Sequence, residues 1–130
     1  VIICTSFQHP FYPNSHWSGE HPNILLTPMV AFSDFRDVKQ AWQEQWKTAL
    51  IKHKPEMILL SAGFDAHTKD PMSQINWQTE DYGWLTREIV QLSEEICDGR
   101  IVSMLEGGYH LEALADSADL HIRCLAKNEN

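Results

Sequence analysis

The sequence predicts an α/β fold with a mostly parallel sheet, because short apolar segments alternate with longer amphipathic ones. Helical patterns separate or follow these segments over the C-terminal hundred residues, which favours right-handed crossovers and helices on both faces of the sheet. At 130 residues and 43% hydrophobic, the chain has the size of one domain or a piece of one. The segments that we expect to be buried strands are residues 1–4, 24–26, 57–61 and 101–105.

The first helix is expected to begin after Ser33 or Asp34, either of which can act as an N-cap, and to end before Pro55. Apolar residues recur within it every four positions and form one stripe, which indicates core packing. This stripe consists of Val38, Trp42, Trp46 and Leu50, with Ala41 and Ala49 beside it.

Two further helices follow. Thr79 can cap the second, whose first turn carries Glu80 and Asp81 where the helix dipole favours acidic residues, and Gly99 offers a stop. Its apolar positions follow at steps of three and four residues and are Tyr82, Leu85, Ile89, Leu92 and Ile96. The third carries Leu111, Leu114, Ala118, Ile122 and Leu125.

Charge and cysteine content argue against several classes of protein. The formal net charge is −8 with only ten Lys and Arg residues, which disfavours direct binding of nucleic acid. Cys4, Cys97 and Cys124 are widely spaced and odd in number, which argues against a disulfide framework and favours the reducing cytoplasm. No apolar run has the length of a membrane span, so we expect no membrane association. The first residues do not look like a signal peptide, and the missing initiator Met suggests a chain cut from a longer one.

Asp65 is the leading candidate for chemistry. It lies in a Gly-bearing turn directly after the strand expected at 57–61, where an open α/β sheet holds metals or substrates. The alternative is a turn carboxylate that bonds local backbone amides. Asp65-x-His67 invites a zinc interpretation, but a local pair supplies only two of the three or four ligands that zinc requires, so we expect His67 to be a solvated loop residue.

A second strand end, after residues 101–105, also carries glycines and a reactive side chain. Gly107 and Gly108 allow a tight turn that would project Tyr109 over the same edge of the sheet. A phenol there can donate a hydrogen bond to a carbonyl oxygen as negative charge develops. The alternative is a Tyr that packs its ring and bonds a backbone carbonyl. We expect Glu106 to face away and His110 to begin the next helix.

Other polar residues have simpler explanations. Asp70 precedes Pro71, and Asp before Pro commonly starts a turn. The remaining histidines show no metal-binding spacing, so we expect surface or packing roles for His9, His16, His21, His53 and His121. Residues 8–22 contain three prolines between aromatic residues and are expected to form a long loop, which is either functional or a plain surface excursion.

Three motifs taken together resemble the C-terminal part of the zinc-dependent histone deacetylase superfamily. They are Leu-Leu-Ser-Ala-Gly-Phe-Asp-Ala-His-x-x-Asp-Pro at 59–71, Thr-Glu-Asp-Tyr-Gly-Trp-Leu-Thr at 79–86, and Leu-Glu-Gly-Gly-Tyr-His-Leu-Glu-Ala-Leu at 105–114. Within the superfamily, the wording is most similar to bacterial deacetylase-like amidohydrolases, acetylpolyamine amidohydrolases and class II enzymes. The resemblance implies a three-layer αβα fold of the arginase/deacetylase type, of which residues 1–130 would form the C-terminal portion of one catalytic domain.

The resemblance also implies roles for individual residues. Asp65 would be a zinc ligand, Tyr109 the tyrosine that polarises the acyl carbonyl, and Gly108 part of the wall of the acyl-lysine tunnel. Tyr12, within Phe-Tyr-Pro at 11–13, would line the same tunnel, although the glycine-rich continuation of the family is absent. The backbone near Thr5 and Ser6 would lie close to a structural potassium site. The substrate would be acetyl-lysine, an acetylated polyamine or a similar N-acyl amine.

The paired catalytic histidines and the Asp-x-His ligands of the family lie upstream of the segment that begins here. The chain by itself is therefore expected to be an inactive portion of a deacylase. Two alternatives remain: a stand-alone α/β binding module, and an arginase-type manganese amidohydrolase, which would need further Asp and His motifs that the sequence lacks. Removing neighbouring strands should also expose a sheet edge and apolar area, so we expect self-association.

Overall fold

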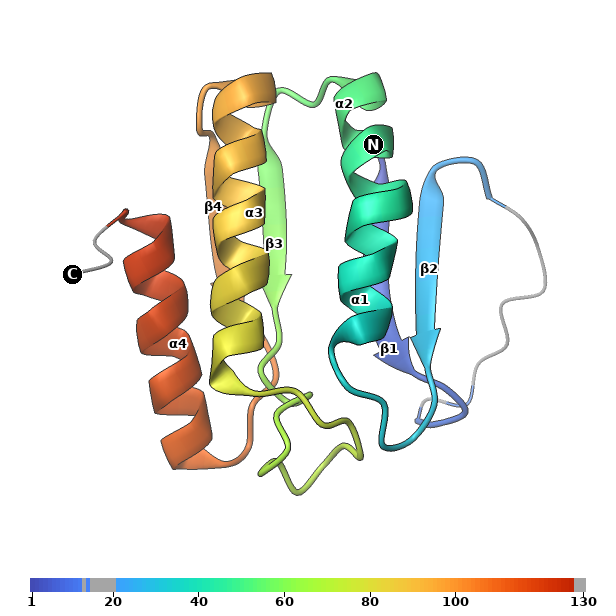
Figure 1. Ribbon diagram of the computed structural model, residues 1–130, viewed down its shortest axis with the longest axis vertical. Coiled ribbons are helices and arrows are strands. Elements are labelled where there is room, and N and C mark those ends of the chain that lie inside the picture. Colours follow the sequence, from blue (N-terminus) through green and yellow to red (C-terminus); the bar gives the residue numbers. More distant parts are fainter. Residues whose placement is uncertain (13, 15–20, 128–130) are drawn as a thin grey trace.

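The computed structural model describes residues 1–12, 14 and 21–127, and it shows strands and helices arranged side by side as in an α/β protein (Figure 1). The strands are β1 (Ile3–Gln8), β2 (Ile24–Met29), β3 (Ile58–Ala62) and β4 (Ile101–Leu105). The helices are α1 (Arg36–Ala41), the π-helix η1 (Trp42–Trp46), α2 (Lys47–His53), α3 (Thr79–Cys97) and α4 (Leu111–Leu125). All four expected strands are present, although β1 begins and ends later than residues 1–4.

The strands form two parallel pairs. β1 pairs with β2 from Ile3 opposite Ile24 to Gln8 opposite Met29, and β3 pairs with β4 in the same manner over five residues. Figure 1 shows all four strands running in one direction, so that their carboxyl ends lie at the same end of the molecule. Within the described residues the two pairs are not hydrogen-bonded to each other. The expectation of parallel strands joined by helical crossovers is confirmed.

Each strand keeps one edge without a hydrogen-bonded strand beside it within the described part of the chain. In a parallel ladder the N–H and C=O of one residue point to the same neighbour, and those of the next residue point away. The Ile58 N–H donates to the Arg100 carbonyl beside β4 at 2.9 Å, so the backbone groups of Leu59 and Ser61 point to the opposite edge of β3. By the same alternation one edge of β1 is open, because the Ile3 N–H donates towards β2.

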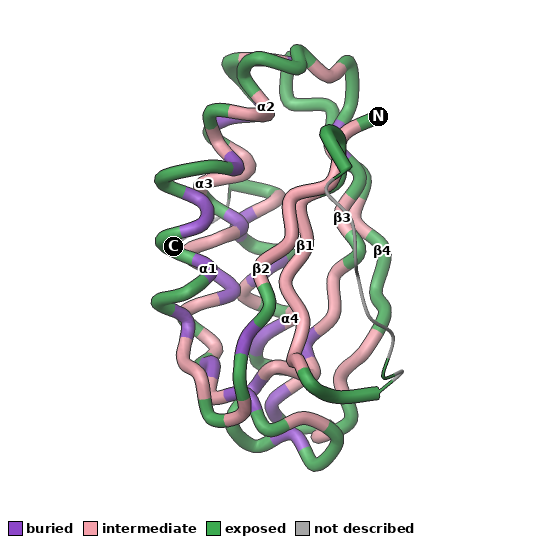
Figure 2. Tube along the Cα trace, turned by 90° about the vertical axis from the view of Figure 1, so that its right-hand side faces the viewer, coloured by how far each residue is buried: buried purple, intermediate pink, exposed green. Residues whose placement is uncertain are grey.

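Helices cover one face of the strands and leave the other face exposed in the described structure (Figure 2). On β3 and β4 the covered side includes Ile58, which is buried, and Ser103, whose hydroxyl lies 2.8 Å from His121 Nε2 on α4. Of the two helical layers expected, the described residues therefore supply one. The exposed side, which we call the outer face, consists of Leu59, Ser61, Val102 and Met104.

The first helical segment contains a π-helical stretch that the sequence did not predict. An α-helix turns once in 3.6 residues, so a stripe repeating every four residues drifts around its surface. The wider turn of η1, with i→i+5 hydrogen bonding, compensates for that drift and keeps Val38, Trp42 and Trp46 buried together. The Trp42 Nε1–H donates to Glu88 Oε2 on α3 at 2.8 Å, which joins the two helices.

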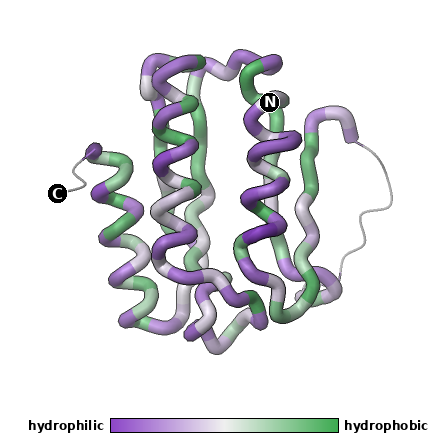
Figure 3. Tube along the Cα trace, viewed as in Figure 1, coloured by the Kyte–Doolittle hydropathy of each residue, from purple (hydrophilic) through white to green (hydrophobic). Residues whose placement is uncertain are grey.

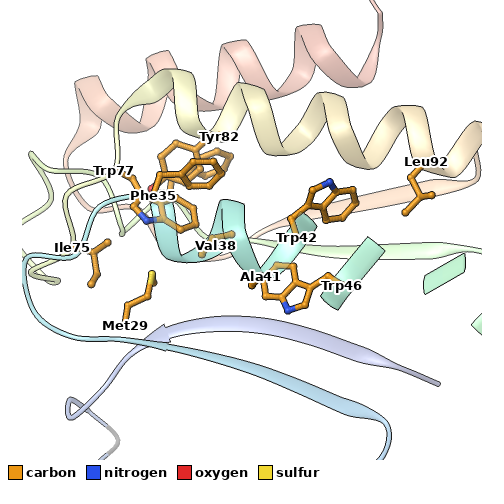
Figure 4. Packing of buried hydrophobic residues seen from close by; sticks show 11 residues of the cluster. Met29, Phe35, Val38, Ala41, Trp42, Trp46, Ile75, Trp77, Tyr82 and Leu92 are labelled. Carbon is orange, nitrogen blue, oxygen red and sulfur yellow. The ribbon is translucent and has the colours of Figure 1, made fainter. Parts of the chain in front are cut away.

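One hydrophobic cluster runs between the helices and the strands (Figure 4). It connects Met29 at the end of β2 with Leu92 on α3, and both tryptophans of the first helical segment belong to it, as predicted. Figure 3 shows long hydrophobic runs along the strands and mixed hydropathy along the helices, as expected for amphipathic helices packed on a sheet. The buried members of the cluster are Met29, Phe35, Val38, Ala41, Trp42, Trp46, Phe64, Ile75, Trp77, Tyr82 and Leu92.

Two helix starts differ from expectation by one residue. The N-cap of α1 is Phe35, and Asp34 acts just before it by accepting the Arg36 N–H at 2.9 Å. The N-cap of α3 is Gln78, whose side chain forms a reciprocal capping box with Asp81, so Thr79 is the first helical residue. The predicted stop at Gly99 is confirmed, since Gly99 has a positive φ of 70° directly after the C-cap of α3.

Candidate functional site

The candidate site lies where the chain leaves β3 and β4. Both strands continue into loops at the same end of the molecule, and the two loops contact each other. The Phe64 N–H donates to the Gly107 carbonyl at 2.8 Å, and the Glu106 N–H donates to the Ala62 carbonyl at 3.0 Å. These bonds extend the ladder past the strands, so the first residues of each loop are held as firmly as the strand ends.

Asp65 is half-buried on the first loop, with its carboxylate against Gly107 of the second. Burial raises the pKa of this carboxyl, and the negative charges of Asp70 and Glu106 raise it further. None of the described residues forms an ion pair with Asp65. A partly desolvated carboxylate without a cation is costly in a folded protein, and a bound cation would compensate for that cost.

Gly107 makes room for the Asp65 carboxylate. A Cβ atom built on Gly107 would lie 2.8 Å from both Cγ and Oδ2 of Asp65, closer than non-bonded atoms normally approach. Gly107 does not have a positive φ. Its lack of a side chain is therefore required by the close approach of the carboxylate and not by an unusual backbone conformation.

Tyr109 follows on the same loop, with its ring exposed. It is 56% exposed, which does not fit the alternative of a packed tyrosine. Gly108 before it has a φ of 138°, and a Cβ there would meet Leu114 at 2.9 Å and Phe64 at 3.2 Å. The conformation needed to project Tyr109 is therefore open mainly to glycine.

Asp70 connects the two loops. Its Oδ1 accepts the Met72 N–H at 2.8 Å, which is the local turn bond expected for Asp before Pro. Its Oδ2 accepts the Tyr109 N–H at 2.7 Å, a contact over 39 residues that the sequence did not indicate. Asp70 is only 8% exposed, and both bonds are partly buried.

The expectation that His67 is solvated was wrong, since it is 4% exposed. Its Nδ1 accepts the Lys69 N–H at 3.1 Å, which leaves the proton of the neutral ring on Nε2, 3.3 Å from Thr79 Oγ1. Burial lowers the pKa of His67 and favours that neutral ring. Both nitrogens are engaged, so His67 supports the loop and is not available to a metal.

The other predicted residues lie as follows. His110 caps α4 as expected, with its Nδ1 accepting the Ala113 N–H at 3.2 Å, and Glu106 is exposed. His121 is a packing residue, buried between α3, β4 and α4. Tyr12 lies four residues after the end of β1 and is 82% exposed. Pro13 and His16 fall outside the described residues.

Thr5 and Ser6, the residues expected near a potassium ion, lie within β1. They pair with Leu26 and Thr27 of β2. By the alternation along β1, the Thr5 carbonyl points to β2 and the Ser6 carbonyl to the open edge. Only the second is free to coordinate a cation.

The fit of these residues to zinc is partial. A half-buried carboxylate that forms no ion pair with the described residues and lies against Gly107, with the Tyr109 loop beside it, suits one ligand position of a catalytic zinc site. In the described parts of the chain no group of three or more His, Cys, Asp or Glu side chains could hold a metal ion. Zinc requires three protein ligands in such sites, so Asp65 could supply one and the others would have to come from elsewhere.

Comparison with known proteins identifies the family. The model of the histone deacetylase domain matches residues 1–125. The chain belongs to the histone deacetylase family. It is 45% identical over 130 residues to histone deacetylase 14, chloroplastic, of Arabidopsis thaliana, which covers 88% of this chain and 31% of that protein. It is 42% identical over 71 residues to the polyamine deacetylase HDAC10 of Homo sapiens, which covers 55% of this chain and 10% of that protein.

Solved structures of deacetylase domains share the fold. The HDA15 HD domain superposes with a TM-score of 0.84 at 24% identity, over 98% of this chain and 38% of that one. This likeness confirms the α/β fold of the arginase/deacetylase type. The chain spans about a third or less of the length of the relatives described here. No helix in the described residues is long and apolar enough to cross a bilayer.

The sequence identified Asp65, Gly108 and Tyr109 as site residues from motifs, but it gave no role to Gly107 beyond a turn and none to Asp70 beyond a local bond. The signal for Gly107 was its place in a double glycine after a strand. For Asp70 no signal existed, because its partner is the backbone N–H of Tyr109, and the presence of a backbone N–H does not depend on the type of side chain, except in proline.

Proposed function

We propose that the protein is a zinc-dependent deacylase that hydrolyses N-acetyl-lysine or acetylated amines, and that this chain contributes Asp65 as a metal ligand and Tyr109 as a hydrogen-bond donor. The observation that carries this proposal is the half-buried Asp65 carboxylate, which forms no ion pair with the described residues and lies against Gly107 on the loop that presents Tyr109. Membership of the histone deacetylase family supports it.

Each site residue of this chain would have its own role in amide hydrolysis. Bound zinc would supply Lewis acidity to the scissile carbonyl and to a water molecule. Asp65 would hold the ion at the carboxyl end of β3. Tyr109 would donate its phenolic hydrogen to the acyl oxygen as negative charge develops there. Gly108 and Tyr12 would form part of the wall along which the acyl chain enters.

The substrate class is supported by the relatives. One is named a histone deacetylase and another a polyamine deacetylase, so acetyl-lysine and acetylated polyamines are both candidates. The net charge of −8 suits a cationic amine substrate. The cysteines Cys4, Cys97 and Cys124 are not joined in a disulfide, which is compatible with the reducing cytoplasm that we include in the proposal. A potassium ion at the Ser6 carbonyl is a further part of it.

The test compares wild type with two variants of the full-length protein, using an acetyl-lysine peptide and N-acetylated polyamines as substrates. Tyr109→Phe removes only the hydroxyl of an exposed ring, so we expect kcat to fall about 10²- to 10³-fold with unchanged stability and zinc content. Asp65→Ala should lower both zinc content and activity. Full activity of Tyr109→Phe on both substrates would contradict the proposal.

We further propose that the 130-residue chain by itself neither holds zinc tightly nor hydrolyses amides, since it supplies one ligand in its described residues. It should also self-associate. β1 and β3 each keep an open edge, and the outer face exposes apolar side chains beside it. Elemental analysis for zinc and sedimentation of the isolated chain test these two statements.

A further inference from the structure

We infer that Asp70 is a positioning residue for Tyr109: its carboxylate fixes the tyrosine loop to the loop that carries Asp65, so that phenol and metal ligand keep one relative position. The inference deepens the proposed function and rests on it. It follows from the two hydrogen bonds of Asp70, one within its own loop to the Met72 N–H and one across to the Tyr109 N–H.

The Asp70 side chain is itself rigidly held. Its backbone N–H donates to the His67 carbonyl at 2.8 Å, and Oδ1 accepts the Met72 N–H at 2.8 Å. With the backbone and one carboxylate oxygen fixed, Oδ2 has little freedom when it accepts the Tyr109 N–H at 2.7 Å. A bond from an amide to a buried carboxylate is charge-assisted and short, and it is stronger than a neutral one.

The Tyr109 loop needs such an anchor. Gly107 and Gly108 precede Tyr109, and glycine loses more conformational freedom on ordering than any other residue. The Gly107 carbonyl is held by Phe64, and regular α4 bonding begins with the Leu114 N–H to the His110 carbonyl. Between these points the Tyr109 N–H is tied to the other loop by Asp70. The ring itself is exposed and packs too little to fix the loop.

A second contact joins the Asp70 loop to the start of α4, close to Tyr109 in sequence, and provides a matched control. Lys69 Nζ lies 3.9 Å from Glu112 Oε2, with the two side chains 51% and 73% exposed. Exposed pairs of this kind contribute little to stability. Glu112→Gln therefore removes one negative charge and one contact between the Asp70 loop and the first turn of α4, and it leaves the Asp70–Tyr109 bond intact.

Asp70→Asn is the decisive variant because it keeps the size of the side chain. Two N–H groups need two acceptor oxygens, and the carboxamide has only one, so either Met72 or Tyr109 loses its partner. We expect amide hydrogen exchange at Tyr109 to accelerate at least 10-fold in Asp70→Ala, which removes both acceptors, and exchange at Tyr109 or Met72 to accelerate in Asp70→Asn according to which N–H keeps the carboxamide oxygen. Exchange at both amides should be unchanged in Glu112→Gln. Unchanged exchange at Tyr109 in both Asp70 variants would overturn the inference.

A double-mutant cycle in the full-length enzyme separates positioning from general structural damage. Asp70→Asn should lower kcat about 10- to 100-fold while KM changes less than about twofold, because a displaced catalytic group costs rate and not ground-state binding. In a Tyr109→Phe background the same substitution should have little further effect. An equal loss of kcat in both backgrounds would show that Asp70 does not act through Tyr109.

The outcomes distinguish the two levels of the proposal. If wild type hydrolyses acylated amines and Tyr109→Phe slows it, but Asp70→Asn resembles Glu112→Gln, the proposed function stands and the role of Asp70 is refuted. If wild type is inactive on every acylated amine, or Tyr109→Phe has wild-type activity, the proposed function fails and the positioning role fails with it. The proposed function and the positioning role are both supported if Asp70→Asn slows turnover only when Tyr109 is present and if the Tyr109 amide exchanges faster in the Asp70 variants.

Discussion

Gly107→Ala should displace the Asp65 carboxylate and weaken metal binding while leaving the fold largely intact. The new Cβ would lie 2.8 Å from Cγ and Oδ2 of Asp65, whereas ordinary contact begins at 3.4 Å. The carboxylate must therefore retreat by about 0.6 Å, slightly more than the roughly 0.5 Å within which a working site holds its groups. Because Gly107 does not have a positive φ, alanine adds no backbone strain that would confuse the result.

The magnitudes follow from that displacement. Disturbing the orientation of a metal ligand typically costs about 10- to 100-fold in affinity, and we expect zinc affinity to fall by that factor. Overpacking lowers the free energy of unfolding by about 1–3 kcal/mol. Alanine also reduces the conformational entropy of the unfolded chain, which raises the free energy of unfolding by about 0.4–1 kcal/mol. The obstructed group is a half-buried side chain that can rotate, so the net loss of stability should lie near the lower end, about 1 kcal/mol.

Gly63→Ala is the matched control, since its Cβ would approach the same carboxylate less closely, at 3.1 Å from Oδ1. Zinc affinity of the full-length variants is measured by competition with a chelating dye, and stability by thermal unfolding. The ¹³C shift of the Asp65 carboxyl in the isolated chain reports its displacement without metal. The reasoning is refuted if Gly107→Ala binds zinc like wild type, or if Gly63→Ala is affected more strongly.

Three further outcomes are expected. Burial lowers the pKa of His121 below its usual 6.5, so the contribution of the neutral ring to the free energy of unfolding should be fully present above pH 6.5 and should be lost as the pH falls below that value. His121→Gln should make the free energy of unfolding depend less on pH, as measured by chemical unfolding at several pH values. Leu92 is 1% exposed, so Leu92→Ala should lower the free energy of unfolding by about 2–5 kcal/mol. A decrease below about 1 kcal/mol in urea unfolding would contradict the buried position of Leu92 in the core. Leu59→Lys should reduce self-association of the isolated chain in sedimentation velocity, because it places a charge on the outer face. Ile122→Lys places the same charge on the exposed side of α4 and should leave self-association unchanged. Equal effects of the two substitutions would argue against association through the sheet.

The limits of sequence reasoning are visible at particular residues. The stripe through Trp42 and Trp46 correctly predicted burial, because apolar spacing reports which residues share a face. It did not predict η1, since short four-residue repeats also occur in α-helices, and the widened turn is visible only in the structure, where Trp42 and Trp46 are buried and Trp42 bonds Glu88 of α3. The sequence predicts a solvated His67, because a histidine in a polar loop gives no sign of its distant neighbours. In the structure His67 is buried, with a β-bridge to Trp77 and with Thr79 of α3 beside its ring.

The sequence by itself determined the parallel strands, the helices between them and the placement of Asp65 and Tyr109 at strand ends, because periodicity and glycine turns are local properties of the chain. Its motifs also indicated the deacetylase family, which comparison confirmed. Only the tertiary structure decided that Gly107 cradles the Asp65 carboxylate and that Asp70 holds the Tyr109 backbone. The bond from the Tyr109 N–H to Asp70 joins segments 39 residues apart through a backbone group that every residue except proline possesses, so the residue type could not announce it. The Gly107 contact needs a glycine, but a glycine after a strand does not reveal which distant side chain lies against it.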